Sequence, residues 1–108
     1  MGYHEPDVYN QPEKFGLTIV YILELSEPCY SFDMLVIWSH VDSGYYWGTD
    51  AGCSCAAPFE ADTELNDITP FVYAEIKAYL RGRIGAYKSN VTNDTIDGIL
   101  YDIRKVTA

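Results

Sequence analysis

The strongest constraint on the fold is an alternation of apolar side chains, with a period of two, in the first half of the chain. In residues 17–25 the alternating positions are expected to share one face of a strand: Leu17, Ile19, Tyr21, Leu23 and Leu25. Residues 30–39 repeat the pattern with Tyr30, Phe32, Met34, Val36 and Trp38. A turn at residues 41–44, with Gly44 in a left-handed conformation, leads to a third predicted strand at residues 45–49. Short connections of this kind predict an antiparallel meander.

The second half of the chain changes to helical spacing. Thr69 and Pro70 suit the N-cap and first turn of a helix, whose apolar stripe is Val72, Ile76, Tyr79, Leu80 and Ile84. A last helix begins near Thr92 or Asn93, with the stripe Ile96, Ile99, Leu100, Ile103 and Val106. Neither helix is long enough to be stable alone, so both are expected to pack on the sheet. The sequence predicts an α+β fold of the order βββαα in one domain, residues 17–108. An extended N-terminal arm, residues 1–16, precedes it and docks through Tyr3, Tyr9 and Phe15.

The charge of the chain is strongly negative and unevenly placed. The net charge is −9, with −11 on residues 1–68 and +2 on residues 69–108. Phosphate backbones repel such a surface, which argues against nucleic-acid binding, whereas a basic protein surface would be attracted. No apolar run is long enough to span a membrane, and residues 1–6 lack the pattern of a signal peptide. We therefore expect a cytosolic protein without membrane contact.

The most distinctive short segment contains two cysteines, Cys53 and Cys55, one residue apart. A thiolate metal site would need further ligands, and the candidates are Cys29, His4 and His40. No second cysteine pair exists. His40, at the end of the second strand, could reach Cys53 or Cys55 as the base that a catalytic cysteine requires, but no other member of a catalytic triad is visible. The interpretation we favour is a tight loop in which Gly52 supplies a special backbone angle. The sequence therefore predicts no cofactor, no metal and no catalytic residue; a small metal- or thiol-dependent module is the alternative.

Aromatic residues are unusually frequent, with ten tyrosines and two tryptophans. Tyr45, Tyr46 and Trp47 are consecutive, so at least one ring faces away from the others. Exposed tyrosine and tryptophan are typical anchors of protein interfaces, although the same rings could cover the two faces of a thin sheet. We predict a protein-binding surface where the third strand meets the cysteine loop. It consists of Tyr45, Tyr46 and Trp47 with the surrounding acids Asp50, Glu60, Asp62 and Glu64.

Residues 30–38 and the segment after them resemble a known family. The matching residues are Tyr46, Trp47 and Asp50, followed by the motif loop Gly52, Cys53, Ser54, Cys55, Pro58, Phe59 and Glu60. The chain is similar, from roughly Gln11 to Arg83, to an uncharacterised family of small acidic proteins encoded by bacteriophages of actinobacteria. That family carries a proline directly after the second cysteine, where this chain has Ala56. No established activity comes with the resemblance.

The resemblance implies a phage accessory protein made in the cytoplasm of the infected bacterial host. Combined with the charge and the aromatic residues, it favours a protein that binds a host or phage protein, as an inhibitor or an anti-defence factor. A minor virion or assembly component is a further alternative. The sequence does not identify the partner or the oligomeric state.

Overall fold

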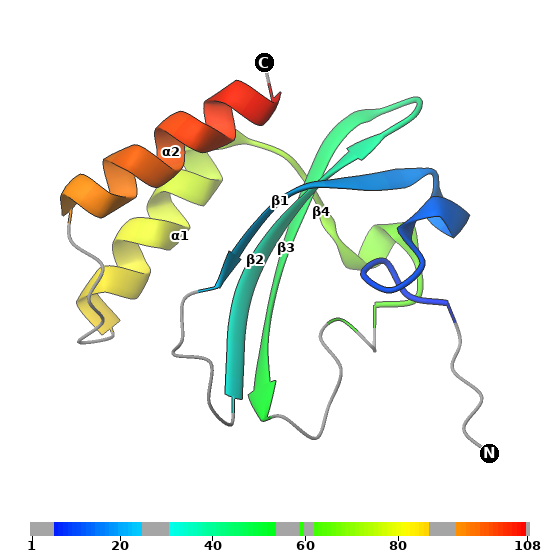
Figure 1. Cartoon of the computed structure of the whole chain (residues 1–108), viewed down its shortest axis with the longest axis horizontal. Helices are drawn as coiled ribbons and strands as arrows, with labels where there is room; N and C mark the ends of the chain where they lie inside the picture. The colour runs from blue at the N-terminus through cyan, green and yellow to red at the C-terminus, as the bar shows by residue number, and fades with distance from the viewer. Residues whose placement is uncertain (1–5, 25–30, 54–58, 60–61, 87–92, 108) are drawn as a thin grey trace. The chain divides into compact units, whose positions relative to one another are not determined.

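In the computed structural model of the chain, residues 6–24, 31–53, 59, 62–86 and 93–107 are described. They form two compact units, residues 1–70 and 71–108, which we describe separately. The first unit contains a four-stranded antiparallel sheet in the order β1-β2-β3-β4 (Figure 1). Its strands are β1 (Leu17–Glu24), β2 (Ser31–His40), β3 (Gly44–Cys53) and β4 (Thr69–Pro70), with the short 3-10 helices η1 (Pro12–Phe15) and η2 (Leu65–Asp67). The predicted α+β class is confirmed.

The hairpin of β2 and β3 is the most regular part of the sheet. All ten residues of β2, from Ser31 to His40, pair with β3 in continuous register. The turn at residues 41–43 is followed by Gly44 with a φ angle of 86°, a left-handed conformation as the sequence predicted. The third strand is longer than predicted, because Asp50, Gly52 and Cys53 continue the ladder. Gly52 is thus a strand residue opposite Phe32, and the expectation that it bends a loop was wrong.

The predicted shared face of the first strand was also wrong, because the strand contains a β-bulge. Ile19 pairs with Trp38 and Tyr21 pairs with Ile37, so Val20 has no partner on β2. One extra residue moves every later side chain to the opposite face of the sheet. Leu17 and Ile19 therefore face the core of this unit, whereas Tyr21 lies on the other face.

The sheet has a fourth strand that the sequence did not predict. Thr69 and Pro70, expected to begin a helix, pair with Trp47 and Tyr46 at the edge of the sheet. Proline is tolerated there because an edge strand does not need every backbone N–H for its ladder. The first helix begins three residues later than Pro70, at Tyr73.

The core of the first unit lies on one face of β2 and includes the N-terminal segment. The alternating side chains of β2 and several loop residues form it: Val8, Leu17, Met34, Val36, Trp38, Phe59 and Ile68. Val8 is fully buried, and its carbonyl oxygen accepts a hydrogen bond of 2.8 Å from Trp38 Nε1. Tyr9 and Phe15 pack on this core, as predicted. However, residues 8–15 form a turn and η1 where the sequence suggested an extended arm; Tyr3 lies outside the described residues.

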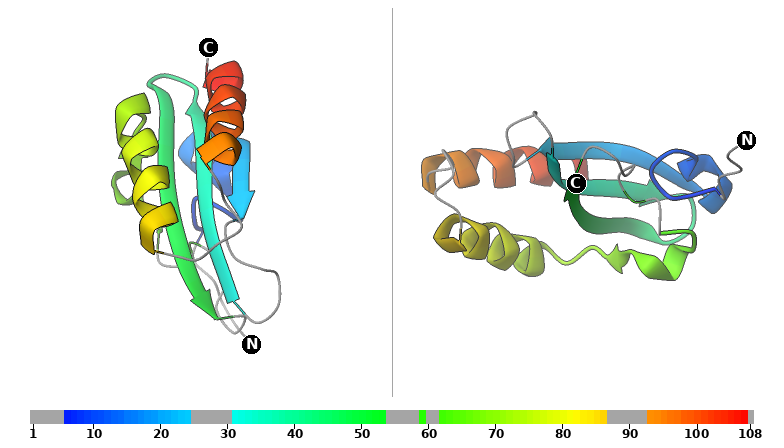
Figure 2. Two further views of the ribbon diagram at one scale, coloured as in Figure 1. Left: turned by 90° about the vertical axis from the view of Figure 1, so that its left-hand side faces the viewer. Right: turned by 90° about the horizontal axis from the view of Figure 1, so that it is seen from below.

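The second unit consists of the helices α1 (Tyr73–Ala86) and α2 (Asn93–Thr107). They contact each other and lie side by side (Figure 2). The predicted stripe of α1 is buried only in part: Ile76 and Leu80 are buried, whereas Val72 is exposed and precedes the helix. The stripe of α2 is largely buried, at Ile96, Ile99, Leu100 and Ile103. The Arg104 guanidinium lies 4.5 Å from the centre of the Tyr73 ring and links the last turn of α2 to the first of α1. The packing of the helices on the sheet stays a prediction.

Candidate functional site

The three consecutive aromatic residues of the predicted interface divide between the two faces of the sheet. Tyr46 pairs with Trp38 and packs on the core of the first unit. Tyr45 and Trp47 point to the opposite face because side chains alternate along a strand. All three rings are partly buried. They therefore do not form one continuous aromatic patch.

Asp50, predicted as a rim acid, stabilises the chain segment that follows β3. One oxygen of its carboxylate accepts a 2.7 Å hydrogen bond from the backbone N–H of Phe59, and the other accepts the N–H of Ala51 at 3.0 Å. Phe59 has a φ angle of 61°, which is rare for a residue with a bulky side chain. Its buried ring lies 5.4 Å from the Trp38 ring, edge to face, and stacks on Tyr9. Asp50 thus helps to hold a strained residue that fills the core.

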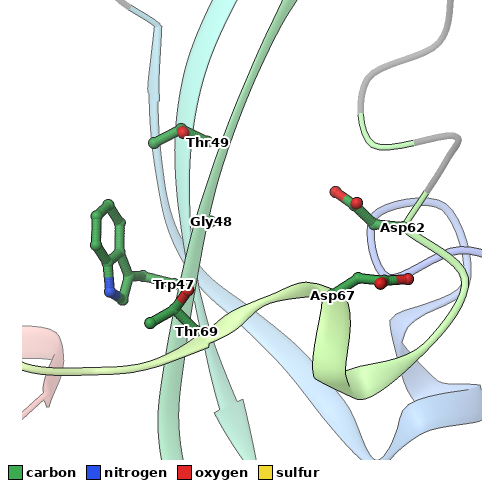
Figure 3. A pocket seen from close by; sticks show the side chains of 6 residues that line it. All are labelled: Trp47, Gly48, Thr49, Asp62, Asp67 and Thr69. Atoms are coloured by element: carbon green, nitrogen blue, oxygen red, sulfur yellow. The ribbon is translucent and has the colours of Figure 1, made fainter.

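A hollow of about 200 Å³ lies beside β3, at the point where β4 leaves it. Figure 3 shows Asp62 and Asp67 on one side of β3 and the Trp47 ring on the other. The residues that line the hollow are Trp47, Gly48, Thr49, Asp62, Asp67 and Thr69. Such a volume is below the range of about 300–1,000 Å³ typical of small-molecule sites, and it suits a single side chain better than a metabolite.

Three other aspartates lie close enough to Asp62, in the lining of this hollow, to affect its carboxylate. Burial raises the pKa of Asp62, and the negative charges of Asp50, Asp67 and Asp7 raise it further. The other three carboxylates have structural partners: Asp7 accepts the backbone N–H groups of Tyr9 and Asn10, and Asp67 closes the capping box of η2. Within the part of the chain that the structure describes, no group donates a hydrogen bond to the Asp62 carboxylate. Asp62 is the acid of this cluster whose carboxylate has no such partner among the described residues.

Replacing Asp62 by asparagine is expected to stabilise the protein near neutral pH. The folded state raises the pKa of Asp62, so protonation favours folding. The stabilisation from the protonated Asp62 carboxyl is fully present below the pKa that this group has in the unfolded state. It is lost as the pH rises through the higher pKa of the folded state. The gain for Asp62→Asn should be at most about 1 kcal/mol, because the side chain is partly exposed and solvent screens the repulsion. Urea unfolding at pH 7 and pH 3 checks this: a gain at pH 3 as large as at pH 7 would contradict it.

The remaining residues of the predicted site contribute less to this geometry. Glu64 is exposed and forms the other half of the capping box with Asp67. Ser54, Cys55, Pro58 and Glu60 lie outside the described residues, as does the Cys53 side chain.

Among the side chains that are described, no group of three or more histidine, cysteine, aspartate or glutamate residues could hold a metal ion. The described helices include none that is long and apolar enough to cross a membrane.

Two residues that line the hollow, Trp47 and Asp62, belong to the surface predicted from the sequence. The other lining residues were not predicted as site residues: Gly48, Thr49, Asp67 and Thr69. Asp67 follows Glu64 by three residues, a spacing that marks a helix start and could have revealed their capping box. No local signal places Thr49 beside Thr69, because only the pairing of β4 with β3 brings these segments together.

The sequence profile of a domain of unknown function (DUF7574) matches residues 6–108. The chain belongs to this family. The match begins within the N-terminal segment and extends over both units, so the DUF7574 domain includes the hollow and the helical pair. Comparison with curated proteins and with solved structures found no significant match.

Proposed function

We propose that this protein acts by binding another protein, and that the acidic hollow beside β3 is part of the binding surface. The observation that carries the proposal is the position of Asp62. Its carboxylate lines the hollow, lies near three other aspartates, and receives no hydrogen bond from the described residues. Holding this charge costs stability, and no contact from the described residues to the carboxylate offsets the cost, a pattern that is typical of functional sites.

The charge and size of the hollow define the partner's chemistry. A negative site is complementary to lysine or arginine side chains, and complementary charges raise the rate of association. The net charge of −11 on residues 1–68 extends the attraction beyond the hollow. The partner is thus a protein with a basic segment at its binding surface.

The resemblance to phage proteins of actinobacteria supplies the biological setting of this proposal. The partner would be a host or phage protein in the cytoplasm of the infected bacterium. A small acidic protein that occupies a basic surface can block whatever that surface normally binds. The proposed role is that of an accessory protein that inhibits its partner, for example a component of host defence.

Affinity capture from cells of an actinobacterial host tests the proposal with a matched pair of charge reversals. Asp62→Lys changes the hollow, whereas Glu13→Lys makes the same change in charge at an exposed position of η1. We expect wild type and Glu13→Lys to capture the same protein, and Asp62→Lys to lose it. Asp62→Lys removes a repelled carboxylate, so its melting temperature should not fall. Equal capture by all three proteins would contradict the assignment of the binding surface to the hollow.

A further inference from the structure

The outer edge of β3 has backbone groups that no described strand uses. Strand β4 pairs with β3 at Tyr46 and Trp47, and the pairing stops there. The segment from Gly48 to Cys53 continues in register with β2 on its inner side. Among the described residues, no strand pairs with its outer side. An unpaired strand edge of this kind is a template for another extended chain.

Pro70 shows which residues of β3 direct their backbone N–H and C=O groups away from β2. Proline has no backbone N–H, so the Tyr46–Pro70 pair cannot exchange two hydrogen bonds, and the Trp47–Thr69 pair must be the hydrogen-bonded one. Because the pairing of β3 with β2 contains no bulge, the outward direction recurs at every second residue. The N–H and C=O groups of Thr49 and Ala51 therefore point away from β2, and those of Asp50 point toward it.

Among the described residues, this edge has few of the features by which proteins usually protect an exposed strand. The outer edge of β1 is interrupted by the bulge at Val20, and bulges discourage pairing. Residues 48–53 contain no proline, no lysine and no bulge, and three of them are glycine or alanine. Their charged residue, Asp50, directs one carboxylate oxygen to the N–H of Phe59 and the other to the N–H of Ala51, so Ala51 offers only its C=O group to a second strand. A second backbone can approach such a segment closely.

We infer that the partner binds by adding an extended, lysine- or arginine-bearing segment to the outer edge of β3, with a basic side chain in the hollow. Thr49 belongs both to the open edge and to the lining of the hollow, which joins the two features. A strand hydrogen-bonded to both backbone groups of Thr49 and to the C=O of Ala51 would pass the hollow that Asp62 and Asp67 line. Backbone pairing supplies affinity and the basic side chain supplies specificity, as in other complexes formed by strand addition. This inference rests on the proposed function and names the form of the partner.

Amide hydrogen exchange on the full chain tests the inference directly. The probe is a synthetic eight-residue peptide of alternating lysine and threonine, and a glutamate-for-lysine peptide is its control. We expect saturating lysine peptide to slow exchange at the Thr49 amide by at least about tenfold, as hydrogen bonding protects it. The Ala51 amide, which already donates to the Asp50 carboxylate, should change less. The Asp50 amide, which already faces β2, should not change. Asp62→Lys should weaken peptide binding by at least about tenfold.

The possible outcomes separate this inference from the proposed function. Weaker binding by Asp62→Lys without protection of the Thr49 amide would overturn strand addition and leave the acidic hollow as the binding surface. If the lysine peptide protects the Asp62→Lys variant from exchange as strongly as the wild type, the hollow has no role in binding, and strand addition is still supported. Wild-type protein that binds neither peptide at about 1 mM would overturn the inference.

A proline at the open edge provides a second and independent test. Thr49→Pro removes one outward N–H, and a strand edge that faces solvent tolerates proline. We expect the variant to keep the circular dichroism spectrum of the wild type and to lose peptide binding by at least about tenfold. A folded Thr49→Pro variant with wild-type affinity would overturn strand addition.

Discussion

Replacing Trp38 by alanine is expected to destabilise the first unit by about 3–5 kcal/mol. The side chain is fully buried, contacts the Phe59 ring edge to face, and donates a hydrogen bond to the Val8 carbonyl oxygen. Alanine leaves a cavity between the sheet and the N-terminal segment. A loss of this size is a large part of the 5–15 kcal/mol that usually separates folded from unfolded states. Urea unfolding monitored by circular dichroism measures it.

One further variant separates the causes of this loss, and a second is a control at an exposed ring. Trp38→Phe keeps most of the apolar contact but leaves the Val8 carbonyl without its donor, and it should cost about 1–3 kcal/mol. Tyr101→Ala removes a ring that is 62% exposed on α2, and it should change the stability by no more than about 0.5 kcal/mol. If Trp38→Phe is as stable as the wild type, the hydrogen bond to Val8 does not contribute to stability.

Adding one methyl group at Gly48 is expected to have the second-largest effect. A Cβ atom there would lie 3.2 Å from Ile68, 3.3 Å from Phe59 and 3.4 Å from Trp38. The atoms that it would meet belong to buried side chains, which have little room to move. Gly48→Ala should therefore cost about 1–3 kcal/mol through overpacking. It should also loosen Phe59, and with it the segment that leads to Asp62.

Gly98 on α2 is the matched control for Gly48. A Cβ atom at Gly98 meets nothing within 4 Å, so Gly98→Ala only removes the backbone freedom of a glycine inside a helix. It should stabilise the second unit by about 0.5–1 kcal/mol. Differential scanning calorimetry of both variants checks that Gly48→Ala lowers the stability and Gly98→Ala raises it. Similar effects of the two substitutions would show that the crowding at Gly48 relaxes without cost.

The open edge of β3 and the acidic hollow have one physical origin. Strand β4 is only two residues long, so β3 lacks a described outer partner beyond Trp47. Before β4 the chain turns through η2, and Asp67 of η2 and Asp62 ahead of it line the hollow together with Thr49. A longer β4 would fill the hollow and protect the edge. The short strand therefore makes both proposed binding features available.

The sequence alone determined the elements whose signals are local. Alternating apolar residues predicted β2, the position of Gly44 predicted the turn of the hairpin, and the apolar stripe predicted α2. The acids of the site were partly predicted too, with Asp50 and Asp62 among them. These signals need only the covalent neighbours of each residue, because side-chain period and turn conformation depend on nearby backbone geometry.

Only the tertiary structure decided the features that depend on a distant partner. The bulge at Val20 exists because β1 pairs with β2 in two registers. It places the side chains from Tyr21 onward on the face opposite to the predicted one. Thr69 and Pro70 are a strand because Tyr46 and Trp47 lie beside them; their local sequence favours a helix start equally well. The roles of Asp50 and Asp62 likewise differ through their neighbours, since one carboxylate binds the Phe59 N–H and the other faces the hollow. Strand pairing and charge proximity join residues far apart in the chain, and local patterns do not contain that information.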